Sequence, residues 1–144
     1  KNKLRIVFAL GETTITNTTE IDVINSFHSH PMSKNPLPTG LEHQFFLNAL
    51  AQYELEISDL GFDETIGEFT AKIDRGAILT LGMLMYVEFL TRELSRIEKL
   101  NGFHGKDIQM TGSDGSKRVT LSDLELEINR VNELLHKQKV HAYN

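Results

Sequence analysis

Two histidines that lie two residues apart are the side chains whose types and spacing most directly suggest chemistry. His28 and His30 occur in the segment Phe27-His28-Ser29-His30-Pro31. On an extended chain, residues two apart project to the same side, so both imidazoles could bind one zinc ion. A shared metal ion is therefore one hypothesis for this segment.

The His-Ser-His-Pro motif resembles the metal-binding motif of the JAMM (MPN-type) zinc isopeptidases. That resemblance implies a downstream serine, a carboxylate ligand and an upstream glutamate that activates water. Thr39 and Glu42 have the serine-to-acid spacing, displaced by one residue and with Thr in place of Ser and Glu in place of Asp. Glu12 or Glu20 would be the upstream glutamate.

One functional hypothesis is accordingly a JAMM-like zinc-dependent metallopeptidase with His28, His30 and Glu42 as metal ligands. We favour the other interpretation, in which the two histidines are exposed loop residues. The isopeptidase fold continues with several strands after this motif, whereas this chain continues with long helical patterns, and short motifs often match by accident. His43 has no partner four residues away, as in His-Glu-x-x-His, so we expect a surface histidine there.

The composition limits the classes of protein that fit. A chain of 144 residues with 40% hydrophobic and 24% charged residues is typical of one globular domain. The formal net charge of −5 argues against sequence-independent nucleic-acid binding, which needs a lysine- and arginine-rich surface. Cysteine is absent, which excludes disulfides, a thiol nucleophile and four-cysteine zinc sites.

A membrane-spanning segment is not expected. The longest uncharged apolar stretch runs from Ala77 to Val87, which is shorter than the roughly 20 residues that a spanning helix needs, and Glu88 follows it directly. We interpret this stretch as a buried helix. The beginning of the sequence has no long apolar region before a small-residue cleavage site, so no secretory signal is expected.

Apolar residues at helical spacing predict four helices. The first is short and begins after Thr19 as its cap, and the second opens at Thr39 with a capping box to Glu42. The expected ranges are 20–27, 39–53, 72–100 and 121–140. A proline-rich linker, HPMSKNPLPTG, separates the first two.

The last two helices each carry an apolar stripe, and we expect the stripes to face each other in an antiparallel hairpin. The stripes comprise Leu90, Leu94, Ile97 and Leu100 in the third helix and Leu121, Leu124, Ile128, Val131 and Leu135 in the fourth.

Between these helices lies a polar, glycine-spaced arm, residues 102–120. Structureless connections longer than about 12–15 residues are uncommon unless they have a function. The segment Ser113-Asp114-Gly115-Ser116 is typical of a tight turn, so we expect a small β-hairpin that becomes ordered against a neighbouring molecule. The contact residues that we predict in the arm are Lys106, Asp107, Ile108, Met110 and Arg118.

The fold class that we expect is mainly α: a small helical bundle with a long buried helix, an extended N-terminal segment and a protruding β-hairpin-like arm between the last two helices. Residues 1–37 would form an extended N-terminal arm and linker. Residues 38–144 would form the helical domain.

The segment LTRELSRIEKLNGFHGKDIQMTGSDGSKRVTLSDLELEINRVNELLHKQK resembles small neck proteins of tailed bacteriophages, the head-to-tail connector or head-completion adaptors of Gram-positive phages. The preceding PTGLEHQFFLNALAQYELEISDLGFDE is also similar. The resemblance covers residue 38 to about residue 139.

This resemblance implies a non-enzymatic structural protein of the virion neck, assembled in the host cytoplasm. Such adaptors form homo-oligomeric rings, commonly dodecamers, that join the portal protein to the next neck or tail protein. DNA would pass through the lumen without specific binding, which agrees with a mildly acidic chain. No cofactor, catalytic residue or membrane is expected. A third hypothesis is a soluble helical regulatory module that does not assemble.

Overall fold

The computed structural model describes residues 16–31, 36–100 and 112–142, and within these ranges the chain is mainly helical. The expected fold class, a small helical bundle with one long buried helix, is confirmed. The elements in chain order are α2 (Glu20–His28), α3 (Thr39–Glu56), β1 (Phe62–Asp63), β2 (Glu68–Phe69), α4 (Arg75–Leu100) and α5 (Gly112–Ala142).

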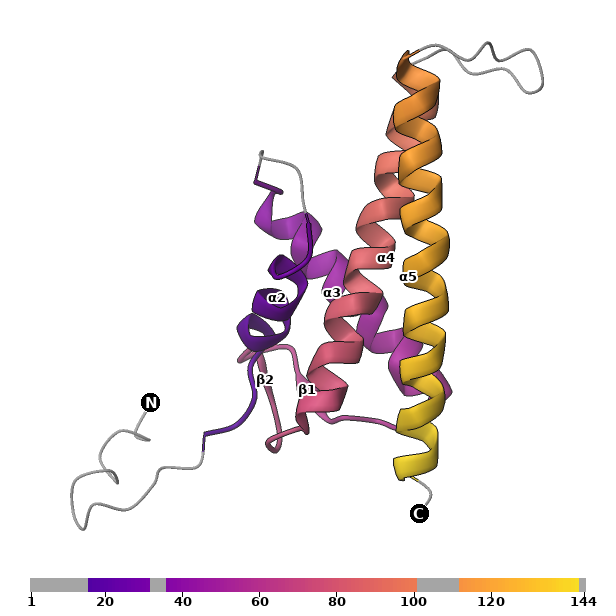
Figure 1. Ribbon diagram of the computed structural model, residues 1–144. Helices are drawn as coiled ribbons and strands as arrows, with labels where there is room; N and C mark the ends of the chain where they lie inside the picture. Colours follow the sequence, from indigo (N-terminus) through magenta and orange to yellow (C-terminus); the bar gives the residue numbers. More distant parts are fainter. Residues whose placement is uncertain (1–15, 32–35, 101–111, 143–144) are drawn as a thin grey trace.

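Helix α4 lies at the centre of the fold. Its first half is flanked by α2, α3 and α5, which all pack against it (Figure 1). Leu81 and Met85 are completely buried there, and Phe89 and Leu90 continue the core. A helix that is apolar on nearly every side must be covered by other elements on every side. Helices α2, α3 and α5 provide this cover.

Helix α2 begins where the sequence predicts it. Thr19 caps the helix through a capping box, in which the Thr19 hydroxyl accepts from the Asp22 amide while the Asp22 carboxylate accepts from the Thr19 amide. Val23 and Phe27 are fully buried in the common core. The expected division at residue 37 therefore does not coincide with a break in packing, because α2 belongs to the same hydrophobic body.

The predicted capping box at Thr39 is wrong. Thr39 is the first residue of α3, Pro38 occupies the cap position, and no side chain caps the helix. The amides of Leu41 and Glu42 donate to the Pro38 carbonyl instead. The carboxylate of Glu42, which the capping box would have used, accepts a hydrogen bond from His28.

An antiparallel β-hairpin with two residues in each strand connects α3 to α4, and Phe62 lies opposite Phe69. These two rings contact each other and also Phe46, at centroid separations of 4.8–6.2 Å. The hairpin thereby closes one end of the core below α2 (Figure 1).

The helical hairpin of α4 and α5 is longer than predicted. Helix α5 begins at Gly112, so the expected turn 113–116 and the remainder of the predicted arm, to residue 120, lie in a helix and not in a β-hairpin. Serine and aspartate also suit the first turn of a helix, and that preference prevails here over the tight turn. Residues 102–111 of the predicted arm lie outside the described residues.

The predicted stripe on α5 is only partly correct. Leu124 and Val131 are buried against α4, whereas Leu121 and Ile128 remain 39% and 37% exposed. Glu127 takes a buried position in the seam between the helices. The face of α5 that packs on α4 is therefore turned away from Leu121 and Ile128 and toward Glu127. The predicted apolar stripe is broader than the part of α5 that α4 can cover.

Gly82 provides the closest approach between α4 and α2. A Cβ atom at this position would lie 2.5 Å from the Ser26 hydroxyl oxygen, 2.9 Å from the Ser26 Cβ and 3.1 Å from the Phe27 backbone nitrogen. Gly82→Ala should therefore lower the free energy of unfolding by about 1–3 kcal/mol, although alanine favours helices. Urea unfolding monitored by circular dichroism measures the change.

The matched control is Gly40→Ala in α3, where the added methyl group meets nothing within 4 Å. This variant should be neutral or more stable by up to about 1 kcal/mol. Equal effects of the two substitutions would contradict the close α2–α4 packing.

Candidate functional site

The predicted zinc ligands His28 and His30 do not face a common point. His28 is the last residue of α2, and its Nε2 donates to Oε2 of Glu42 at 2.5 Å. His30 stacks on Tyr86 with ring centroids 4.8 Å apart, and its Nδ1 donates to the Phe27 carbonyl. The expectation assumed an extended chain, but a helix end with a turn sends residues two apart in different directions.

Of the other residues of the zinc hypothesis, Glu42 is brought into contact with His28. Thr39 is exposed at the start of α3, and Glu20 pairs with His43. Glu12 lies outside the described residues. Over the described part of the chain, no group of three or more histidine, aspartate or glutamate side chains is arranged to hold a metal ion.

His43 is more than the surface histidine that we expected. Its Nδ1 donates to Glu20 of α2 at 2.8 Å, and its Nε2 donates to Glu64 in the β1–β2 turn at 3.4 Å. The hydrogen bond to Glu20 raises the pKa of His43, burial opposes the effect, and the carboxylate of Glu64 adds to it. A protonated His43 therefore joins three elements of the body.

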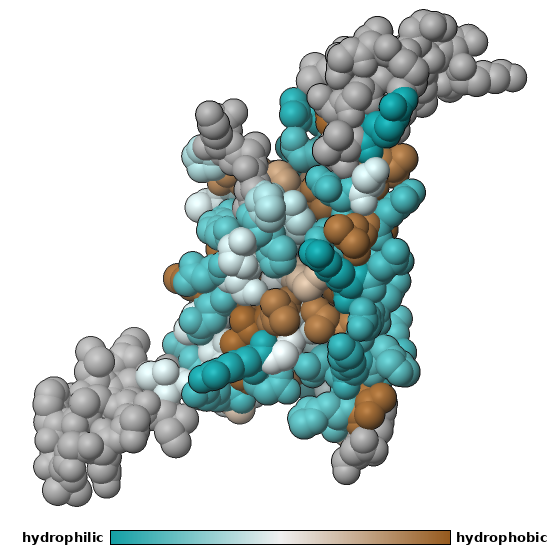
Figure 2. Space-filling view, viewed as in Figure 1, coloured by the Kyte–Doolittle hydropathy of each residue, from teal (hydrophilic) through white to brown (hydrophobic). Residues whose placement is uncertain are grey.

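The outer half of the α4–α5 hairpin extends beyond α2 and α3 (Figure 1). Hydrophobic side chains are interspersed among hydrophilic ones along it (Figure 2). On α5 these include Leu121, Leu126 and Ile128, which are 39%, 49% and 37% exposed. Arg118, the one predicted arm residue within the described ranges, is exposed on the same helix, while Lys106, Asp107, Ile108 and Met110 lie outside these ranges.

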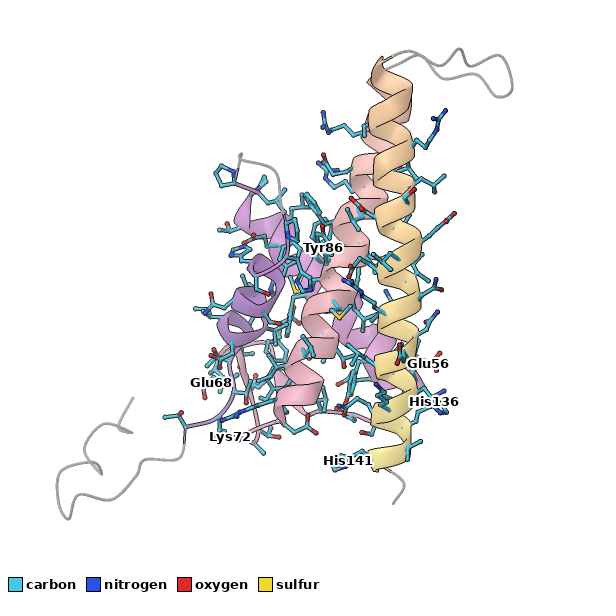
Figure 3. The ribbon with its side chains drawn as sticks, viewed as in Figure 1. Glu56, Glu68, Lys72, Tyr86, His136 and His141 are labelled. Carbon is cyan, nitrogen blue, oxygen red and sulfur yellow. The ribbon has the colours of Figure 1, made fainter. Side chains whose placement is uncertain are left out.

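The opposite end of the hairpin is fastened to the body. The Tyr53 hydroxyl donates to Oε1 of Gln138 at 3.2 Å, and Lys139 forms an ion pair with Glu56 at 2.8 Å. Figure 3 shows Glu56 beside the lower part of α5. Burial, with a smaller contribution from Asp74, raises the pKa of Tyr53 to about 12, so its hydroxyl remains a donor at neutral pH.

Glu127 is the buried charged residue of the seam. Its side chain is 7% exposed, and Oε1 accepts from Arg130 at 2.8 Å. Among the described residues Oε2 has no hydrogen-bond partner. Burial raises the pKa of Tyr86 on the facing helix, and the charges of Asp123 and Glu127 add to that shift.

Little in the sequence indicates the contacts of these polar groups. Glu127 lies three residues after Leu124 and four before Val131, so helical spacing alone allows it to face α4. The contacts of His43 join residues 23 and 21 positions apart, and only the packing of α2 and the β-turn brings them together.

No protein family, curated protein or solved structure matches this chain. The class of protein is thus defined by its architecture, a helical bundle with a projecting antiparallel helical hairpin. None of the helices in the described ranges has both the length and the apolar character needed to cross a membrane.

His43 should make stability depend on pH. Because the pKa of His43 is raised in the folded state, its contribution is present at pH values below its ordinary pKa and is lost as the pH rises through the raised value. His43→Gln should therefore cost more stability at pH 5.5 than at pH 8.5, as measured by urea unfolding. Glu20→Gln, which removes the main partner, should reduce the same pH dependence, and identical losses at both pH values would refute the assignment.

Glu127 should limit the stability of the hairpin. Replacement of a buried charged group by an apolar one of similar size is often stabilising, so Glu127→Leu should raise the free energy of unfolding by about 1 kcal/mol or more. Arg130→Gln should have the opposite effect, because it leaves the buried carboxylate without its cation. Thermal unfolding of both variants measures the signs, and a destabilised Glu127→Leu protein would count against this account.

Proposed function

We propose that this protein is a structural assembly protein whose projecting α4–α5 hairpin makes the intersubunit contacts. The observation that carries the proposal is the hairpin itself, which extends beyond the body with Leu121, Leu126 and Ile128 partly exposed. A helical hairpin that is anchored at one end and extends beyond the body is suited to reach a neighbouring molecule.

The particular role that we propose is that of a neck adaptor in a tailed bacteriophage, forming a ring between the portal protein and the next neck or tail component. The resemblance of the α4, arm and α5 segment to head-to-tail connector proteins supports this role. A net charge of −5 also suits a ring through which DNA slides, because an acidic lumen does not retain phosphate groups.

The body supplies the rigidity that such a platform needs. The core joins α2, α3, the β-hairpin and the first half of α4, and the lower end of α5 is held by Gln138 and Lys139. A load applied to the outer hairpin would therefore be transmitted to a packed bundle. The arm residues Lys106, Asp107, Ile108 and Met110 would add contacts to adjacent subunits.

Assembly with the portal protein tests this function. Native mass spectrometry of the full chain, alone and with purified portal rings, should show a ring of the protein bound to the portal. Ile108→Ser with Met110→Ser should weaken that binding by at least about tenfold while leaving the helical circular dichroism unchanged, because apolar contacts are lost only at the interface.

Ile21→Ser is the matched control, since Ile21 is 65% exposed on α2, away from the hairpin. It should assemble like the unmodified protein. A chain that stays monomeric and does not bind the portal at any concentration tested would overturn the proposed function.

A further inference from the structure

An open groove lies between α4 and α5 on one flank of the hairpin. Its volume is about 260 Å³, which is enough for one or two aliphatic side chains. Leu79 at its edge is 43% exposed, a large fraction for a leucine in the most apolar helix. The residues that line the groove are Leu79, Met83, Arg130, Glu133, Leu134 and Lys137.

The groove combines apolar walls with charged side chains at its rim, namely Arg130, Glu133 and Lys137. Leu79, Met83 and Leu134 supply the apolar surface. The Arg130 side chain pairs with the buried Glu127, whereas the Lys137 side chain is 66% exposed and pairs with Glu133, which is 68% exposed on the same helix. An exposed pair such as Lys137–Glu133 is weak, so Lys137 can exchange Glu133 for another carboxylate. The groove therefore suits an apolar segment that carries a carboxylate.

Such a segment exists on α5 itself. Leu121 and Ile128 are partly exposed, and Glu125 is exposed between them. These three exposed residues, and not the broader apolar stripe predicted for α5, are called the stripe below. Leu121 and Ile128 are seven positions apart, or about 10.5 Å along a helix. The α5 residues of the groove, Arg130 to Lys137, span the same seven positions, so the two surfaces match in length.

The stripe and the groove lie on opposite flanks of α5. At about 100° per residue, Leu121 and Ile128 lie roughly 50–70° to one side of the buried line through Leu124 and Val131. Leu134 and Lys137 lie about 70–130° to the other side of that line. A subunit therefore cannot fill its own groove with its own stripe, but two copies side by side can bring a stripe and a groove together.

We propose that the stripe of one copy docks into the groove of the next, with Glu125 next to Lys137 of the neighbour. Because the two patches differ, the contact is head-to-tail, and repetition gives a closed ring or an open filament. This inference rests on the proposed assembly function and identifies the surfaces that would form the interface.

Two variants test the docking in the full-length protein. The stripe variant is Leu121→Gln with Ile128→Gln, and the groove variant is Leu79→Gln. Each should weaken self-association by at least about tenfold in analytical ultracentrifugation, with the helical circular dichroism retained. An equimolar mixture should form heterodimers and nothing larger, because one intact stripe and one intact groove remain in the mixture.

A charge exchange gives a second measurement that does not depend on the apolar substitutions. Glu125→Lys and Lys137→Glu should each weaken self-association, and the double variant should restore it, because the attraction is reversed but retained. The control is Ile66→Gln in the β1–β2 turn, 63% exposed, which should assemble normally.

The outcomes separate this inference from the proposed function. If the unmodified protein does not self-associate and does not bind the portal protein, the proposed function is refuted. If it assembles while the stripe and groove variants assemble equally well, or if only the groove variant fails, the docking is refuted and the function stands.

Discussion

The burial of the first half of α4 is the constraint on which the remaining structure depends. Leu81 and Met85 are fully enclosed, and such a segment folds only when helices cover it on every side. Helices α2 and α3 cover two sides, and the close approach at Gly82 allows α2 to lie directly on the α4 backbone. The second half of α4 extends beyond these two helices, so within the described ranges α5 is the helix that accompanies it. The projecting hairpin is thus a consequence of a core that covers only part of one long helix.

Polar interactions then fix the ends of these elements. His43 links α3 to α2 and to the β-turn, whereas Gln138 and Lys139 hold the end of α5 against α3. Toward the outer half of the hairpin the seam contains a buried carboxylate, Glu127, in place of an apolar side chain. The hairpin is therefore held against α3 at one end and contains a buried charged group farther along its seam. This difference supports the proposal that the outer half contacts another molecule.

The sequence predicted the features that depend on local pattern. The Thr19 cap, the buried α4 and the antiparallel pairing of α4 with α5 follow from residue types and helical spacing, and all three are confirmed. The predicted capping box at Thr39 shows where local pattern is insufficient. Glu42 instead bonds His28, which is distant in the sequence and cannot be predicted from local residue types. The hydrogen bonds of His43 to Glu20 and Glu64 were not predicted, for the same reason. The helical start of α5 at Gly112 was missed because the same serine and aspartate residues favour both a tight turn and a helix N-terminus.

Because the sequence contains no cysteine, disulfide trapping can test whether the stripe of one copy docks into the groove of the next. With Leu79→Cys and Ile128→Cys in one chain, the two thiols lie on opposite flanks of the hairpin, where a bond within one subunit is not feasible. Mild oxidation of the assembled protein should give a ladder of covalent oligomers on a non-reducing gel, and Leu79→Cys with Ile66→Cys should not. If the double-cysteine protein assembles but remains monomeric on that gel, the stripe of one copy does not reach the groove of the next, and the proposed docking is refuted.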